Sequence, residues 1–152
     1  MSSEEKLEQL ETETLEAKKL FSVDYVLSPP KICGSRMIVA VKGKVYGPML
    51  NGTLVEPTSD WLHIKPNGFY NPDVNIVLPD LNCVIETDDG EYIYMHIVGT
   101  SKRREDPTKS EIRSSASFET SAEKYKFLNE KMLVGRGQKD GPNITMSYFD
   151  IV

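Results

Sequence analysis

The sequence predicts an all-β fold, either an antiparallel sandwich or a barrel, over most of the chain. From Leu20 onward, short runs of β-branched and aromatic residues alternate with Gly, Pro, Asn and Asp, a spacing typical of antiparallel strands rather than βαβ units. Asp89-Gly90, a pair suited to a tight turn, separates two of these runs. The length of 152 residues allows one sizeable core and is short for two domains. We therefore expect a single all-β domain.

Residues 1–19 differ from the rest and are predicted to form an N-terminal helical extension. They are rich in Glu, Leu and Lys, contain no Gly or Pro, and begin with Ser2 and Glu5 at the spacing of a capping box. Leu7 and Leu10, followed by Thr14, form only a narrow apolar stripe. The helix should therefore pack loosely or remain solvated; a role in binding a partner or in dimerisation is the alternative.

The strand-like runs number nine or ten and fill residues 20–152. Each combines high β propensity with turn residues at its ends. The predicted strands are Leu20 to Leu27, Met37 to Tyr46, Met49 to Val55, Trp61 to Lys65, Val74 to Leu78, Asn82 to Thr87, Tyr92 to Val98, Ile112 to Thr120, Lys131 to Arg136, and Asn143 to Ile151.

One helix interrupts the predicted strands near the C-terminus. Thr120 and Glu123 have capping-box spacing, and Ala122 to Asn129 consists of helix-forming residues with apolar members available for packing. This helix could close one end of a barrel. The polar stretch from Gly99 to Ser114 is longer than a typical hairpin loop, so we interpret it as a mobile solvated loop or as a lid over the barrel mouth.

The runs on either side of Asp89-Gly90 are predicted to pair as a hairpin. If Thr87 lies opposite Tyr92, side chains alternate between the two faces of the pair with a period of two. One face then gathers uncharged aromatic, thiol and imidazole groups, and it is our candidate for a cavity wall. The other face would be exterior, partly wetted or packed on a partner. The predicted inner face comprises Thr87, Tyr92, Ile85, Tyr94, Cys83 and His96.

Composition excludes several functional classes. The net charge of -5 argues against nucleic acid as the main partner. No segment is apolar enough over the length needed to span a bilayer, and the N-terminus lacks a secretory signal, so we expect a cytoplasmic protein without a membrane partner. Cys33 and Cys83 give little support for a disulfide or a thiolate metal site.

The sequence contains no motif for a bound cofactor or metal. His63 and His96 have no HxH or HExxH spacing, and no glycine-rich phosphate loop or G-x-S-x-G motif occurs. We therefore expect no cofactor, no metal, and either acid–base or purely binding chemistry. His96 could move a proton and Tyr94 and Tyr92 could donate hydrogen bonds to a carbonyl oxygen, whereas the structural alternative is a buried imidazole bonded to a neighbour.

The strand that opens with Asp60-Trp61 offers a second set of candidates. Alternation places Trp61, His63 and Lys65 on one face and Asp60, Leu62 and Ile64 on the other. Trp61 is expected to be a core anchor, an apolar wall of the cavity, or both. A buried Asp60 would need a partner such as Arg36 or backbone amides, and its alternative role is to hold the loop before the strand. Arg36 could orient a ligand carbonyl or carboxylate, or lie on the surface.

An ordered set of fragments resembles the DUF3237 (UPF0311) family over about residues 20 to 152. The fragments are Gly43-Lys44-Val45-Tyr46-Gly47-Pro48-Met49-Leu50-Asn51-Gly52, Ser59-Asp60-Trp61, Thr87-Asp88-Asp89-Gly90-Glu91-Tyr92-Ile93-Tyr94, Phe118-Glu119-Thr120 with Tyr125-Lys126-Phe127-Leu128-Asn129, and Leu133-Val134-Gly135. The resemblance implies a lipocalin-like β-barrel of about eight to ten strands, and some family members look like cofactor-free isomerases, cyclases or pericyclases. Phe69 to Asp80 is an insertion relative to the family pattern, where Leu81-Asn82-Cys83 replaces a usual Arg-Tyr pair.

Together these observations suggest a cofactor-independent enzyme, and the family resemblance implies a role in secondary metabolism. It would enclose a small apolar, carbonyl-bearing metabolite and promote isomerisation, cyclisation or cycloaddition of the (hetero-)Diels–Alderase type, because holding a reactive conformer needs no nucleophile. His96 and Tyr94 would be catalytic, and the substrate would contact Trp61, Tyr92, Phe118, Asp60, Asn129 and Arg36. The alternatives are a non-catalytic carrier or sensor, and an oligomeric scaffold; homo-oligomer formation stays open.

Overall fold

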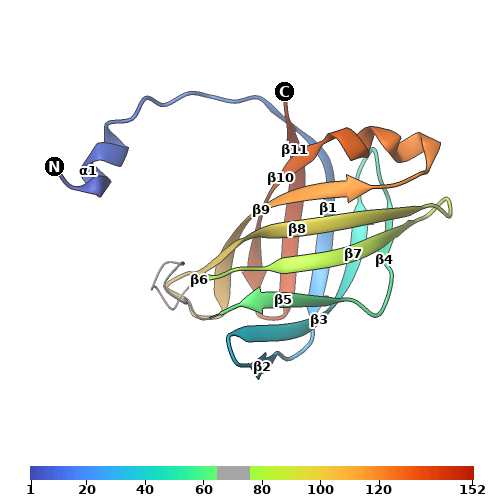
Figure 1. Ribbon diagram of the computed structural model, residues 1–152, viewed down its shortest axis with the longest axis horizontal. Coiled ribbons are helices and arrows are strands. Elements are labelled where there is room, and N and C mark those ends of the chain that lie inside the picture. The colour runs from blue at the N-terminus through green and yellow to red at the C-terminus, as the bar shows by residue number, and fades with distance from the viewer. Residues whose placement is uncertain (65–75) are drawn as a thin grey trace.

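The computed structural model describes residues 1–64 and 76–152 and shows a closed antiparallel β-barrel with a few additional elements (Figure 1). The predicted all-β barrel is confirmed. The elements are α1 (Ser3–Glu8), β1 (Ala17–Leu27), β2 (Lys31–Cys33), β3 (Arg36–Tyr46), β4 (Gly52–Leu54), β5 (Ser59–His63), β6 (Ile76–Val77), β7 (Asp80–Thr87), β8 (Tyr92–Arg103), β9 (Lys109–Glu119), the 3₁₀ helix η1 (Glu123–Glu130), β10 (Met132–Asp140) and β11 (Asn143–Ile151).

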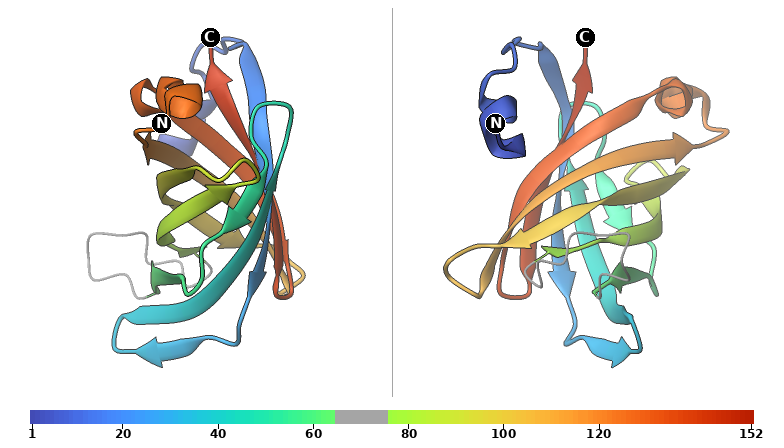
Figure 2. Two further views of the ribbon diagram at one scale, coloured as in Figure 1. Left: turned by 90° about the vertical axis from the view of Figure 1, so that its right-hand side faces the viewer. Right: turned by 60° about the vertical axis from the view of Figure 1, so that its left-hand side comes forward.

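The barrel closes because its two edge regions pair with each other. The hydrogen-bonded order runs β3, β1, β11, β10, β9 and β8, and β8 then pairs with β7. The short strands β4 and β5 each bridge β7 to β3, which completes the circle (Figure 2). Full closure leaves few unpaired edges and creates an interior with two ends.

Alternating side chains fill the barrel interior with a packed core toward one end. On β1, Phe21, Val23 and Tyr25 are buried, as the two-residue period of a strand requires. Phe21 stacks on Tyr148 at a centroid distance of 5.0 Å and meets Phe118 edge-on at 6.0 Å. Apolar residues of this kind supply most of the stabilisation of the fold.

The predicted C-terminal helix is present as η1 and lies across this packed end of the barrel (Figure 1). Tyr125 and Leu128 of η1 are buried, whereas the predicted capping box is wrong. Thr120 Oγ1 instead accepts a hydrogen bond from the Ala122 N–H and donates one to the carbonyl oxygen of Tyr92. Thr120 therefore joins the start of η1 to the β8 strand rather than capping a helix.

The β7–β8 hairpin forms in the predicted place but with a different register. Glu86, not Thr87, lies opposite Tyr92, so Ile85 pairs with Ile93 and Cys83 with Met95. The cause is the length of the loop: Thr87 lies opposite Glu91 with three residues between them, whereas the predicted register requires two or four. Thr87 Oγ1 accepts the Glu91 N–H at 2.8 Å, and the Thr87 N–H bonds the Glu91 carbonyl oxygen. A shift of one residue moves every β8 side chain to the opposite face.

The N-terminal helix is shorter than predicted. α1 ends at Glu8, and residues 9–16 have no regular structure before β1 begins. The capping box of Ser2 and Glu5 is confirmed, with the Glu5 N–H donating to Ser2 Oγ at 3.1 Å. No residue of α1 is buried, and the segment projects away from the barrel (Figure 2). A helix without an apolar face to bury gains little stability from packing. This explains why α1, although it is well capped, is only six residues long.

The predicted loop between Gly99 and Ser114 is wrong over most of its length. β8 continues to Arg103 and β9 begins at Lys109, so the two strands extend as a hairpin in continuous register. The polar composition reflects a hairpin that reaches the rim of the barrel, where half of its residues face solvent. The structure also contains β2, which no predicted strand covered.

Parts of two predicted strands and most of the predicted insertion lie outside the described residues. The undescribed residues are Lys65 at the end of one predicted strand, residues 74–75 at the start of the other, and residues 69–75 of the insertion. In the part of the chain that is described, no helix has the length and apolarity to cross a membrane.

Candidate functional site

The barrel has a cavity of about 440 Å³ at the end opposite η1. Its wall comes from β6 and from the ends of β1, β3, β5, β8, β9, β10 and β11, and it is mostly apolar, as is typical of small-molecule sites. A narrower space of about 50 Å³ continues toward the centre of the barrel. The apolar wall of the larger cavity includes Leu27, Met37, Val39, Leu62, Val77, Ile112 and Ile144, with Pro29, Pro30, Pro79 and Pro142.

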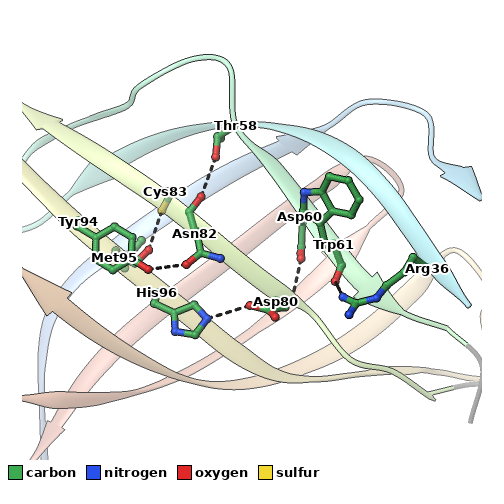
Figure 3. A network of polar contacts seen from close by, with 10 residues as sticks. All are labelled: Arg36, Thr58, Asp60, Trp61, Asp80, Asn82, Cys83, Tyr94, Met95 and His96. Carbon is green, nitrogen blue, oxygen red and sulfur yellow. Dashed lines mark hydrogen bonds and ion pairs between the residues drawn. The ribbon is translucent and has the colours of Figure 1, made fainter. Parts of the chain in front are cut away.

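Asp60 lines both the outer cavity and the inner space. It lies on β5 between Val39 of β3 and Leu81 of β7, so alternation directs it inward with Leu62. Asp60 Oδ1 accepts a hydrogen bond of 2.9 Å from the Asp80 N–H (Figure 3). The expected partnership with backbone amides is thus present, and Arg36 is not its partner.

The environment of Asp60 disfavours its charged form. Burial raises the pKa of Asp60 from 3.8 to about 6, more than the backbone N–H of Asp80 lowers it. The physical cause is the transfer of a carboxylate from water to a largely apolar wall. A carboxyl group with this pKa exchanges a proton near neutral pH, as a general acid or base must.

Two tyrosine hydroxyls form a pair at the inner end of the site. Tyr25 of β1 and Tyr148 of β11 share a hydrogen bond of 2.7 Å between their hydroxyl oxygens, and both residues line the inner space. Burial raises the pKa of both hydroxyls, so both remain protonated. One of the two hydroxyl protons forms this hydrogen bond. Among the described residues neither hydroxyl has another partner. The pair therefore keeps one donor for a ligand.

Ser114 adds a third hydroxyl to the inner space. Its Oγ is buried and has no hydrogen-bond partner among the described residues. Gly99 of β8 and Gly135 of β10 lie directly opposite Ser114 on its two neighbouring strands. A Cβ at Gly135 would clash with Ser114 Oγ and would approach Tyr148 Cε1 to 2.9 Å. The absence of side chains at the two glycines therefore leaves the space that Ser114 and Tyr148 occupy. A buried hydroxyl without a partner is energetically costly unless a ligand or a water molecule forms a hydrogen bond with it.

Cys83 lies near these groups but is not a nucleophile. Burial raises the pKa of its thiol to about 12, and Sγ contacts the carbonyl oxygen of Met95 at 3.6 Å. A thiol that remains protonated at neutral pH is unreactive. The interpretation of Cys83 as a small buried hydrophobic residue therefore fits its environment.

The shifted register corrects the predicted cavity face. Tyr94 and His96, expected to be catalytic, lie on the outer face of β8, and Trp61 lies on the outer face of β5 (Figure 3). Tyr92 lies on the same outer face of β8. Tyr92 is 58 % exposed, Tyr94 38 % and Trp61 50 %. The prediction that they line the cavity, with Trp61 as a core anchor, is wrong because the different loop length turns β8 over and β5 places Asp60 inward instead.

These outward side chains make local contacts with their neighbours. His96 Nε2 lies 2.9 Å from Asp80 Oδ1, and the Tyr94 hydroxyl donates to Asn82 Oδ1 (Figure 3). Tyr92 approaches Glu86 at 3.4 Å. Such cross-strand pairs on the barrel exterior stabilise the β7–β8 pairing modestly.

The remaining predicted site residues lie away from the cavity wall. Phe118 faces the interior but packs on Phe21 in the filled half of the barrel. Asn129 belongs to η1, and its side-chain amide bonds both the N–H and the carbonyl oxygen of Thr120 at 2.8 Å. Arg36 donates to the carbonyl oxygen of Trp61 at 3.4 Å, outside the set of cavity-lining residues. Of the predicted site residues, the structure places Asp60 alone on the cavity wall.

The inner hydroxyl groups were missed because no motif unites them. Tyr25 and Tyr148 are 123 residues apart, and only barrel closure brings β1 beside β11. The available signal was alternation: Phe21, Val23 and Tyr25 share one face of the first strand, as Met146 and Tyr148 share one face of the last. A tyrosine that continues an apolar face is a candidate interior hydroxyl.

Comparisons with known proteins identify related sequences and folds. The family model described as Protein of unknown function (DUF3237) matches residues 15–151. No curated protein matches the chain. A crystal structure of a conserved protein of unknown function from Rhodopseudomonas palustris is similar, with 22 % identity, a TM-score of 0.78, and coverage of 93 % of this chain and 100 % of the other.

Two further structures share the fold. A β-barrel-like protein from Acinetobacter baumannii has 22 % identity and a TM-score of 0.77, and the alignment covers 95 % of this chain and 100 % of the other. A protein described as an enzyme from Penicillium herquei has 20 % identity and a TM-score of 0.59, with coverage of 93 % and 98 %. At this level of identity the similarity establishes the barrel fold.

Proposed function

The chain belongs to the DUF3237 family, and from the cavity in its barrel we propose that it is a cofactor-independent enzyme acting on a small apolar molecule that carries a carbonyl group. The observation that carries this proposal is Asp60, a carboxyl group with a pKa of about 6 in the wall of a largely apolar cavity. The reaction class is isomerisation or cyclisation through proton transfer next to the carbonyl.

The cavity wall fits the apolar body of such a substrate. Leu62, Ile112 and Ile144 are among the side chains that would contact it, and removing apolar surface from water supplies binding free energy of roughly 25 cal/mol for each Å². A volume of about 440 Å³ lies within the range of small-molecule pockets. The apolar surroundings also exclude water from a bound carbonyl.

Asp60 would act as the general base and then as the general acid. Its ionised form removes a proton from the carbon next to the substrate carbonyl, and the electron pair moves to the carbonyl oxygen as an enolate. The protonated carboxyl then returns the proton to a different carbon, which isomerises the substrate. In the ring-closing case the enolate carbon adds to a second carbonyl carbon of the same molecule, the π electron pair of that carbonyl moves to its oxygen, and this oxygen takes the proton from Asp60. No external oxidant or reductant is required.

The hydroxyls of the inner space would stabilise the enolate oxygen. The Tyr25–Tyr148 pair has one proton free for donation, and the Ser114 hydroxyl has no other partner among the described residues. Hydrogen-bond donors fixed in a water-poor site stabilise developing negative charge more than water does. The fold of a Penicillium herquei protein described as an enzyme supports the idea that this type of barrel can carry catalysis.

The test is exchange of the acidic α-protons of 2-tetralone, a small two-ring ketone, followed by NMR in deuterated water. We expect the protein to accelerate exchange, and the rate should rise with pH through about 6 because the ionised form of Asp60 is the base. Replacement Asp60→Asn removes the base and should abolish the acceleration. Asp24→Asn is the matched control, because Asp24 is an exposed carboxylate that bonds the Tyr46 hydroxyl outside the barrel.

Two results would separate catalysis from simple binding. If 2-tetralone binds and exchange is not accelerated, the barrel is a carrier or sensor and the enzymatic proposal fails. If the α-protons of 2-tetralone exchange as fast with Asp60→Asn and with Asp24→Asn as with the unchanged protein, Asp60 is not the base. Tyr148→Phe should slow exchange while leaving Asp60 in place, since the phenyl ring keeps the packing on Phe21 and removes the hydroxyl.

A further inference from the structure

A row of three polar side chains crosses the mouth of the cavity. Arg103 of β8 and Lys139 of β10 both lie directly opposite Ser110 of β9. Residues directly opposite each other in antiparallel strands point to the same face, and all three line the cavity. The mouth therefore presents two cations on either side of a hydroxyl, which we call the mouth row.

The two cations of the mouth row have no ion-pair partner in the described part of the chain. Two neighbouring arginines differ: Arg104, which directly follows β8, and Arg113 of β9 both pair with Glu111. Among the described residues that line the cavity, Asp60 is the one acidic side chain, and it lies deeper in the wall. Two unpaired cations beside an apolar cavity are suited to an anionic group of a ligand.

The polar groups are separated along the wall by an apolar stretch. Ser110, Ile112 and Ser114 follow one another on the inner face of β9. At roughly 3.3 Å for each residue, the four steps from Ser110 to Ser114 span about 13 Å. The cavity thus has a cationic mouth, an apolar middle and a hydroxyl-lined inner end.

We propose that the cavity selects an amphipathic organic acid, with its carboxylate held by Arg103 and Lys139 at the mouth and a carbonyl or hydroxyl group placed at the inner end. The inference rests on the proposed function of the same cavity and adds the class of its substrate. The apolar body between the two polar ends crosses the Ile112 region, and the carboxylate fixes which end of the molecule reaches Asp60. The mouth row is therefore the specificity determinant, and it acts through orientation as well as affinity.

The test compares three probes of one shape by fluorescence titration. The first is 6-hydroxy-2-naphthoate, whose carboxylate and hydroxyl stand at opposite ends of two fused rings. Its methyl ester lacks the anion, and 2-naphthoate lacks the inner hydroxyl. We expect the ester to bind about tenfold more weakly than the acid, and the affinity of the acid to fall as salt is raised.

Variants locate the anion site. Arg103→Gln and Lys139→Gln should each weaken binding of 6-hydroxy-2-naphthoate several-fold, and the double variant should bind acid and ester alike. Arg104→Gln is the matched control, since Arg104 is the next residue along but pairs with Glu111 on the outer face. We expect this variant to bind like the unchanged protein.

The outcomes distinguish this inference from the proposed function. If acid and ester bind equally and the mouth variants change neither, the substrate-class inference is overturned, while 2-tetralone exchange still tests the base. If the acid binds more tightly than the ester and the mouth variants remove this difference, the anion site is supported. If Asp60→Asn nevertheless leaves 2-tetralone exchange unaffected, the catalytic role of Asp60 is refuted. Equal losses in Arg104→Gln and Arg103→Gln would show a general charge effect and also overturn the inference.

Discussion

Replacement of Asp60 by Asn should stabilise the folded chain at neutral and alkaline pH. The side chain sits in the cavity wall, where burial opposes its ionisation. Asn has nearly the same shape and keeps an oxygen that can accept the Asp80 N–H, as Asp60 Oδ1 does at 2.9 Å. The variant therefore removes the buried charge without opening a cavity.

The magnitude follows from the pKa of the buried carboxyl. The folded chain holds the Asp60 proton with a pKa of about 6, against 3.8 for the ordinary group. Between these two pH values the folded state binds more protons than the unfolded state, so stability falls as pH rises. The total loss is roughly 3 kcal/mol, at about 1.36 kcal/mol for each pH unit. It is absent below pH 3.8 and complete above about pH 6.

The stabilisation should therefore appear only on the alkaline side. At pH 8 we expect Asp60→Asn to raise the free energy of unfolding by about 1 to 3 kcal/mol, less than the full loss because the amide N–H₂ also needs a partner in the cavity. Near pH 4 the two proteins should be almost equally stable. Urea unfolding followed by far-UV circular dichroism between pH 4 and 8 measures the difference.

An exposed carboxylate provides the control for this experiment. Asp24→Asn, on the exposed face of β1, should leave the pH dependence of unfolding unchanged or nearly so. Parallel stability curves for Asp60→Asn and the unchanged protein from pH 4 to 8 would refute the reasoning. They would show that the Asp60 carboxylate is solvated or paired in the folded chain.

Three further predictions concern the wall, the exterior and the N-terminus. Gly135→Ala should destabilise the barrel by roughly 1–3 kcal/mol, because the added Cβ would stand 2.9 Å from Tyr148 Cε1. Thermal unfolding measures this loss of stability, and an unchanged melting temperature would contradict the prediction. Tyr94→Phe should leave binding of 2-tetralone unchanged, since the ring lies on the outer face; a loss of affinity by calorimetry would return Tyr94 to the site. Removal of residues 1–14 should not change the melting temperature, because none of them is buried, and a lower value would reveal a contact with the barrel.

Local patterns predicted the fold and many of its strands. Alternation alone separated Asp60 and Leu62 from Trp61 on β5, and the structure keeps that division. The strand pattern is encoded by residues two apart, so it survives without knowledge of what each strand pairs with. The barrel rather than the sandwich came from the family resemblance, because closure depends on pairings between distant strands.

The hairpin register could not be predicted from the same patterns. Asp89-Gly90 is compatible with loops of several lengths, and the choice depends on Thr87, whose hydroxyl bonds the Glu91 N–H and Asp89 Oδ1. Asp89 also accepts hydrogen bonds from Lys124 and Tyr125 of η1, which lie more than thirty residues away. These contacts lower the pKa of Asp89 and hold the loop in its observed form, so tertiary structure decided the register.

The same error displaced the predicted site from the interior to the exterior. Once β8 is turned over, Ile93 and Met95 fill the core, and Tyr94 and His96 face outward. The inner hydroxyls come instead from Tyr25 and Tyr148, in the first and last strands of the barrel. A site assembled by closure has no contiguous sequence signal, and its members can be recognised individually but not as a group.

The most direct test of the central claim is a crystal structure of the protein with 2-tetralone. The account predicts the two rings between Leu62 and Ile112, with the carbonyl oxygen within hydrogen-bond distance of Tyr25, Tyr148 or Ser114 and an α-carbon facing Asp60. A cavity closed by side chains, or a ketone bound on the outer face of β8, would contradict it.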